Sequence, residues 1–192
     1  MNRIQSVPGA QELLDVLKIF ETIPQELALK YLGEKLGYPQ PQNAVRYLLF
    51  GKYAFEDKDS GAICLHQWQK IERAKACAFA VFLELSDGPM LRCNASNYPF
   101  ECIIAAKQHL YQVIDFSNEG ILKMNFYKHM KKSPADKDFN VPVIMLINTQ
   151  EATLNSMDAE GKKYLVPEGN YVVAKILYKG GVQSIDIVER KG

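Results

Sequence analysis

The run Val141-Pro142-Val143-Ile144-Met145-Leu146-Ile147 constrains the fold of this chain more than any other segment. Every residue in it is apolar, so the run lacks the alternation of apolar and polar side chains that marks a strand with one face in water. An apolar run of this length fits a strand that is covered on both faces. We therefore expect it at the centre of an α/β sheet.

Patterns typical of helices and strands surround this run. Helical spacing of apolar residues predicts helices over about 67–85 and about 119–132. Trp68 opens the first of these helices, and we expect it to pack between the two domains. The short polar link between two of the expected strands, 100–106 and 110–116, predicts a hairpin. Further strands are expected at 90–95, 164–166, 171–178 and 183–188.

The first third of the chain has a different pattern. Apolar residues recur at helical spacing over Gln11–Phe20, Gln25–Leu36 and Gln42–Lys52. Two short apolar runs follow, at 53–55 and 62–65, and the polar stretch between them contains the Asp, Ser and Gly residues that favour turns. Three short helices followed by a hairpin predict a small helical domain closed by two strands.

This order of elements resembles the winged helix-turn-helix superfamily over about residues 8–66. The order that follows, a helix, three strands, a helix and a buried strand, resembles the restriction-endonuclease-like core. With the phrases Tyr98-Pro99-Phe100-Glu101 and Leu110-Tyr111-Gln112-Val113-Ile114-Asp115, the chain is similar to uncharacterised bacterial proteins that fuse these two domains. The replication-relaxation family of mobile elements and plasmids is the best known of them, and the resemblance implies a role in DNA transactions.

We therefore expect an α+β or α/β chain with two domains. Residues 1–66 would form a winged helix, and residues 67–192 would form a mixed-sheet, restriction-endonuclease-like domain that is inactive.

Composition excludes several classes of protein. The chain is 47% hydrophobic and 23% charged, which is ordinary for a folded protein, and its formal net charge of +1 gives no global attraction to nucleic acid or anionic membranes. The longest uncharged apolar run, 76–83, is far shorter than the roughly 20 residues of a membrane-spanning helix. We expect a cytoplasmic protein with no membrane partner.

The four cysteines have no metal-binding spacing. None forms a CxxC pair, and no His lies at zinc-ligand spacing beside two of them. We expect buried thiols, no metal and no cofactor; the four residues are Cys64, Cys77, Cys93 and Cys102.

A metal-dependent nuclease site in the second domain would need an acidic residue on one strand and an acid-x-Lys sequence on the next. The candidate acids are Glu101 and Asp115, but Ser117 stands where the lysine should be. A two-residue hairpin loop, Lys107-Gln108, would direct the two carboxylates to opposite sides of the sheet, and a three-residue loop would pair them on one face. Because the lysine is missing, we expect no catalytic residues and no enzyme activity.

Two opposite interpretations fit the outward face of the helix over 42–52. Asn43 and Arg46 suit hydrogen bonding to base edges in a major groove, whereas Tyr47 and Phe50 suit a protein partner. The face lacks a cluster of cations, and the hairpin tip at 56–59 carries three acids against one lysine, which would repel a phosphate backbone.

A basic cluster later in the chain offers contacts to phosphates. Within it, Lys131 and Lys132 are the candidate DNA-binding residues. Its other interpretation is a solvated helix end whose cations offset the helix dipole. The cluster consists of Lys123, Lys128, His129, Lys131, Lys132 and Lys137.

The function expected from the sequence is therefore that of a non-enzymatic accessory or regulatory protein of a bacterial mobile element or plasmid. It would act through double-stranded DNA or a DNA-bound protein. The alternatives are a protein-interaction module without DNA contact and, third, a metal-dependent nuclease that uses Glu101 and Asp115. The sequence fixes no particular partner, DNA site or oligomeric state.

Overall fold

Residues 7–86, 93–95, 98–106, 109–115, 122–123, 126, 143–147 and 171–190 are described by the computed structural model. The chain divides into two units, Met1–Ala95 and Ser96–Gly192. The boundary expected at 66/67 therefore falls inside the first unit. No helix within the described ranges is long and apolar enough to cross a membrane.

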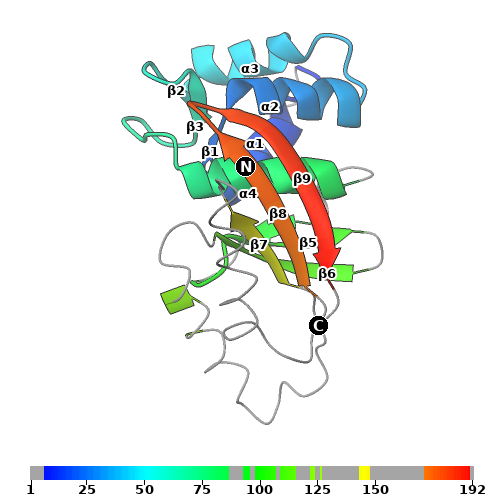
Figure 1. Cartoon of the computed structure of the whole chain (residues 1–192). Coiled ribbons are helices and arrows are strands. Elements are labelled where there is room, and N and C mark those ends of the chain that lie inside the picture. The colour runs from blue at the N-terminus through cyan, green and yellow to red at the C-terminus, as the bar shows by residue number, and fades with distance from the viewer. Residues whose placement is uncertain are drawn as a thin grey trace. The chain divides into compact units, whose positions relative to one another are not determined.

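The first unit combines helices with a small sheet (Figure 1). Its third helix has proline at its first position, where the missing N–H leaves no hydrogen bond unmade. The elements are α1 (Ala10–Phe20), β1 (Thr22–Ile23), α2 (Gln25–Lys30), the π-helical segment η1 (Tyr31–Lys35), α3 (Pro41–Phe50), β2 (Phe55–Asp57), β3 (Ala62–Cys64), α4 (Arg73–Leu85) and β4 (Cys93–Ala95).

The three helices and the hairpin expected in the first third of the chain are confirmed, and one strand is added. β1 lies between α1 and α2 and pairs antiparallel with β3, which gives the sheet order β1-β3-β2. The sequence indicated only a break at Thr22-Ile23-Pro24, because two residues are too few to show an alternating pattern.

The prediction that a helix starts at residue 67 and is opened by Trp68 was wrong. α4 begins at Arg73. The preceding segment forms a β-turn, in which the amide of Gln69 donates to the carbonyl of His66 and Trp68 has a φ of 68°. The apolar spacing that predicted the helix belongs to residues 76–85 and does not extend back through this turn.

Four aromatic rings form the centre of the first unit's core. Phe20 of α1 and Tyr31 of η1 both contact Phe79 and Phe82 of α4, with ring centroids 5.1–6.2 Å apart. All four side chains are buried. The cluster joins α1, η1 and α4 into one core, so α4 packs with the helices that precede it in sequence.

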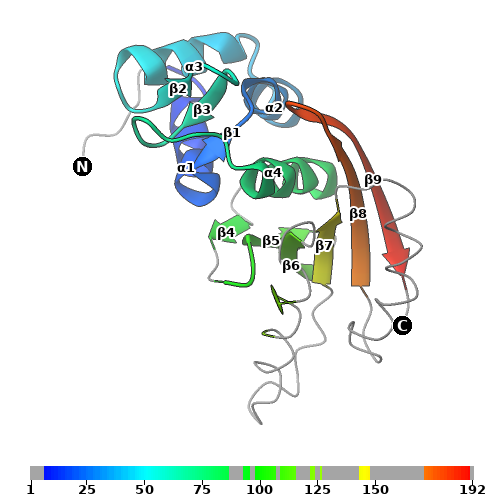
Figure 2. The same cartoon turned by 60° about the vertical axis from the view of Figure 1, so that its left-hand side comes forward.

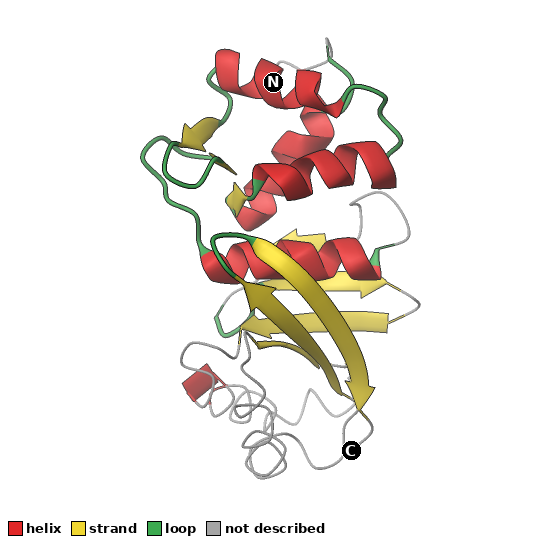
Figure 3. Cartoon of the chain, turned by 45° about the horizontal axis from the view of Figure 1, so that its top comes forward, coloured by secondary structure: helices red, strands yellow, loops and turns green. Residues whose placement is uncertain are grey.

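The second unit contains five neighbouring strands in the order β5-β6-β7-β8-β9 (Figure 2). β6, β7 and β8 run parallel, and β5 and β9 run antiparallel to their neighbours. The two long C-terminal strands lie side by side (Figure 3). The bounds are β5 (Cys102–Ala106), β6 (His109–Asp115), β7 (Val143–Ile147), β8 (Tyr171–Tyr178) and β9 (Val182–Arg190).

The central position expected for the apolar run is confirmed, because β7 lies between two parallel strands. The strand predicted at 171–178 has the same bounds in the structure, and the one predicted at 183–188 lies within β9. The predicted strand at 164–166 lies outside the described residues. Of the helix predicted over 119–132, only Leu122, Lys123 and Phe126 are described, and all three are helical.

We expect Phe79→Ala to lower the free energy of unfolding of the full chain by about 3–5 kcal/mol, as is typical for truncating a buried phenylalanine. The reason is that Phe79 contacts three other rings of the cluster. Chemical denaturation monitored by circular dichroism measures the change. The control Leu177→Ala, at an exposed position of β8, should stay within about 0.5 kcal/mol. Equal effects of the two variants would contradict the assigned core.

Candidate functional site

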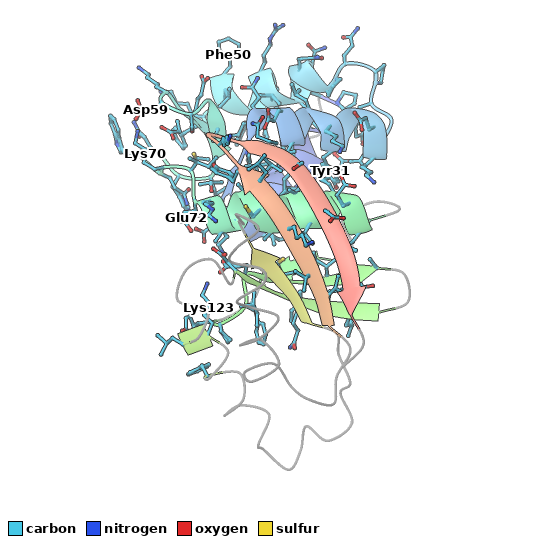
Figure 4. The ribbon with its side chains drawn as sticks, in the orientation of Figure 1. Tyr31, Phe50, Asp59, Lys70, Glu72 and Lys123 are labelled. Carbon is cyan, nitrogen blue, oxygen red and sulfur yellow. The ribbon has the colours of Figure 1, made fainter. Side chains whose placement is uncertain are left out.

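α3 presents one face to the core and one to solvent. Ala44, Val45 and Leu48 are buried, whereas Asn43 and Arg46 are exposed. Phe50 is 86% exposed and projects from the outer side of the helix (Figure 4). We name the outward row Asn43, Arg46, Tyr47 and Phe50 the α3 stripe; its i, i+3, i+4, i+7 spacing puts these residues on one helical face. The structure thus brings together four of the residues that the sequence singled out.

The two ends of the α3 stripe differ in chemistry. At the N-terminal end, the side-chain amide of Asn43 donates to Oε1 of Gln40 at 2.7 Å. At the C-terminal end, the ring of Tyr47 stacks on Tyr53 with centroids 5.9 Å apart. A Cβ on Gly51 would lie 2.6 Å from the Tyr53 ring, so glycine is required for this close packing. A polar end therefore lies next to an aromatic end on the same face of α3.

Two of the acidic residues at the tip of the β2–β3 hairpin are paired with a lysine from outside the hairpin. Asp57 is 5% exposed and accepts hydrogen bonds from Ser60 Oγ at 2.6 Å and Lys70 Nζ at 2.9 Å. Lys70 Nζ also binds the carboxylate of Asp59. We name these four residues the hairpin clasp; Figure 4 shows Lys70 beside Asp59. By sequence, Asp57 counts among three acids that would repel a phosphate backbone; in the structure its charge is buried and paired with Lys70.

The hairpin clasp shifts the pKa values of its members. The Ser60 hydroxyl, followed by the Lys70 ammonium, lowers the pKa of Asp57 to about 2. The two carboxylates raise the pKa of Lys70 above its usual value, with Asp59 the larger cause. Both groups are therefore charged at neutral pH, and the clasp ties the hairpin to the segment that leads into α4.

Trp68 is the functional candidate that the sequence interpretation misplaced. Its side chain is 88% exposed, and its positive φ occurs at the third position of a β-turn, where glycine or asparagine is usual. Holding a bulky residue in this conformation costs about 1–3 kcal/mol. The turn at Trp68 is distinguished from the helix that follows by its backbone conformation, and that conformation has no signal in the sequence.

The register of the β5–β6 hairpin matches the two-residue loop. Ala106 pairs with His109, and Cys102 pairs with Val113. The amide of Glu101 also donates to the carbonyl of Val113, at 2.7 Å, so two consecutive residues oppose one. This is the pattern of a β-bulge, which can redirect a side chain at the end of a strand. Side chains therefore alternate between the two faces of the sheet only as far as Cys102. For this reason, the two-residue loop does not by itself direct Glu101 and Asp115 to opposite faces.

Lys123 contacts both of these acidic residues. Its Nζ lies 3.0 Å from Oε1 of Glu101 and donates to the backbone carbonyl of Asp115 at 3.2 Å. Lys123 is 8% exposed, so the expectation that it belongs to a solvated basic cluster was wrong. The lysine that binds Glu101 therefore lies 22 residues beyond it in the sequence. No sequence spacing could have identified it.

A second contact lies next to this ion pair along both segments. The rings of Tyr98 and Phe126 meet edge to face, with centroids 5.2 Å apart. Each aromatic residue is three positions from one member of the ion pair, Glu101 or Lys123. The two contacts together join residues 98–101 to the helical residues Lys123 and Phe126.

The remaining candidates give a mixed result. Lys131 and Lys132 lie outside the described residues. Cys64, Cys77 and Cys102 are buried as expected, and burial raises the pKa of the Cys64 thiol. In the described part of the chain, no group of three or more His, Cys, Asp or Glu side chains gathers as metal ligands do.

Comparison with protein-family models, curated proteins and solved structures gives no match for this chain.

Asp57→Asn should lower the free energy of unfolding at neutral pH, because it removes the charge that Lys70 and Ser60 stabilise. The folded-state pKa of Asp57 is below its ordinary value of 3.8, so its stabilisation is complete above that pH and is lost as the pH falls towards about 2. The stability difference between wild type and variant should therefore shrink between about pH 4 and pH 2. Denaturant titrations across this range measure it.

Asp15→Asn is the matched control, because Asp15 pairs with Lys18 on an exposed helix surface. Such a pair contributes at most about 1 kcal/mol. A difference between wild type and Asp57→Asn that stays constant down to pH 2 would contradict the pairing in the hairpin clasp.

Proposed function

We propose that the first unit is a winged helix-turn-helix and that the protein is a non-enzymatic accessory or regulatory protein that binds double-stranded DNA through α3. The observation that carries this proposal is the connection α1-β1-α2-η1-α3-β2-β3, in which β1 completes a sheet with the hairpin and α3 keeps one face exposed. In winged helices, the helix before the hairpin enters the major groove. The resemblance drawn from the element order supports a bacterial mobile element or plasmid as the setting.

The chemistry of the α3 stripe supports contact with base edges. Arg46 can bind guanine through two parallel hydrogen bonds, and Asn43 can bind adenine in the same way. Pairing of Asp57 in the hairpin clasp weakens the electrostatic objection to DNA, because fewer uncompensated acids face an approaching phosphate backbone.

The aromatic end of the same stripe supports the alternative, in which α3 binds a protein. Phe50 and the stacked Tyr47 and Tyr53 offer a large apolar surface of the kind enriched in protein interfaces. Under this alternative the protein reaches DNA only through its partner.

We expect the full chain to bind duplex DNA at about 50 mM salt and to lose affinity as salt rises. Arg46→Ala should weaken binding about tenfold, within the 1–3 kcal/mol of a bidentate base contact. Fluorescence anisotropy of a labelled duplex measures both effects. Lys18→Ala, which removes an equal charge from the exposed side of α1, is the control and should bind almost as wild type. Absence of binding at low salt would reject DNA contact by α3 and favour the protein-binding alternative.

A second candidate function is metal-dependent DNA cleavage, and the position of Lys123 favours it. Two acidic residues and a lysine are the groups that such a site requires: the acids hold a divalent metal, and the lysine stabilises developing negative charge. Glu101 and Lys123 form an ion pair beside the backbone of Asp115. If a metal binds there, Glu101 must exchange its contact with Lys123 for the metal.

Incubation of the full chain with supercoiled plasmid and Mg²⁺ or Mn²⁺ separates the two proposals. We expect no nicking, because the Glu101 carboxylate already has its cation in Lys123. Nicking that disappears in both Glu101→Gln and Lys123→Met, but persists in the control Lys179→Met at an exposed turn, would establish the nuclease and reject the non-enzymatic function.

A further inference from the structure

Trp68 combines two features that folding alone does not require. It is the only tryptophan of the chain, and 88% of its surface is in water. It also adopts a φ of 68° in a turn where glycine or asparagine would be free of strain. An apolar ring held in solvent by a strained backbone is typical of a residue retained for contact with a ligand.

The turn that carries Trp68 is fixed from both sides. Its closing hydrogen bond runs from the amide of Gln69 to the carbonyl of His66 at 3.3 Å. The Gln69 side chain accepts from the amide of His66 and donates to Oε2 of Glu21, each at 3.2 Å. The next residue, Lys70, is bound to the hairpin clasp. The backbone below the indole is therefore ordered before any ligand arrives, which reduces the entropy lost on binding.

The residues that flank Trp68 offer hydrogen-bonding groups to a ligand. His66 and Lys70, two positions before and two positions after it, are both exposed. The Lys70 ammonium has three N–H donors, and its contacts with Asp57 and Asp59 use two of them. Asp57 and Asp59 together carry more charge than Lys70 balances, so its remaining N–H is a hydrogen-bond donor and gives no net attraction to a phosphate. An exposed indole with hydrogen-bonding side chains at neighbouring positions of the turn matches a nucleic-acid base, which is planar and carries donors and acceptors on its edges.

We propose that Trp68 stacks on an unpaired base of DNA, so that the protein prefers a duplex that carries a single-stranded extension over a fully paired one. This inference rests on the proposed DNA-binding function. Bases inside a duplex have both faces covered by their neighbours, whereas an unpaired base offers a free face to an aromatic side chain. α3 then binds the paired region, and Trp68 binds the single-stranded region.

The fluorescence of Trp68 provides the direct test, because the full chain contains no other tryptophan. The protein is titrated with one duplex in two forms, blunt and with a single-stranded extension, while anisotropy of a label on the DNA reports binding. We expect the extended DNA to bind more tightly and to quench Trp68, and the blunt duplex to leave the emission almost unchanged.

Variants at this position separate stacking from folding. Trp68→Ala should abolish the preference for the extended DNA, a loss of about tenfold that lies within the 1–3 kcal/mol of one stacked base. Trp68→Phe should keep most of the preference. Leu177→Ala, at an exposed apolar position of β8, is the control and should keep all of it. Thermal unfolding of each variant confirms that the fold is retained.

Two outcomes would overturn the inference, and they differ in what else they reject. If both DNAs bind equally, with Trp68 emission unchanged and Trp68→Ala binding as wild type, stacking is rejected and DNA binding by α3 stands. If neither DNA binds at low salt, the proposed function is rejected and the stacking role with it.

Discussion

The aromatic cluster of Phe20, Tyr31, Phe79 and Phe82 is the interaction on which the first unit depends. Burial of each ring contributes about 1.5–3 kcal/mol, and the cluster joins α1 and η1 to α4, although α3 and the β2–β3 hairpin lie between them in sequence. Because α1, η1 and α4 supply these rings, the core of the first unit does not need the outer face of α3. That face, with Asn43, Arg46, Tyr47 and Phe50, is left for the DNA contact that we propose.

The charges described in the first unit act over short distances, in ion pairs such as those of Lys70. With a net charge of +1, the chain has no long-range field to draw it to DNA. The hairpin clasp instead pairs Asp57 and Asp59 with Lys70 and holds the hairpin against the turn that carries Trp68. Under the proposed function, such a surface binds through specific contacts by a few fixed side chains. Long-range electrostatic attraction contributes little.

Sequence patterns predicted the elements whose side chains repeat with a clear period. The helix that contains Leu13 and Val16 and the strand at 171–178 are examples, and the unbroken apolar run correctly indicated a central strand. Features that depend on a few backbone angles or on distant contacts could not be predicted. The two-residue strand β1, the turn at Trp68 and the bulge at Glu101 have no periodic signal. Lys123 reaches Glu101 only through the fold, which is why a motif search at position 117 missed it.

Amide hydrogen exchange of the full chain, with and without saturating duplex DNA, tests the central claim most directly. DNA contact through α3 predicts slower exchange over Pro41–Phe50 and at the hairpin residues 58–61, with little change on the face of α1 that carries Asp15 and Lys18. Protection confined to the second unit, with α3 unchanged, would contradict the account.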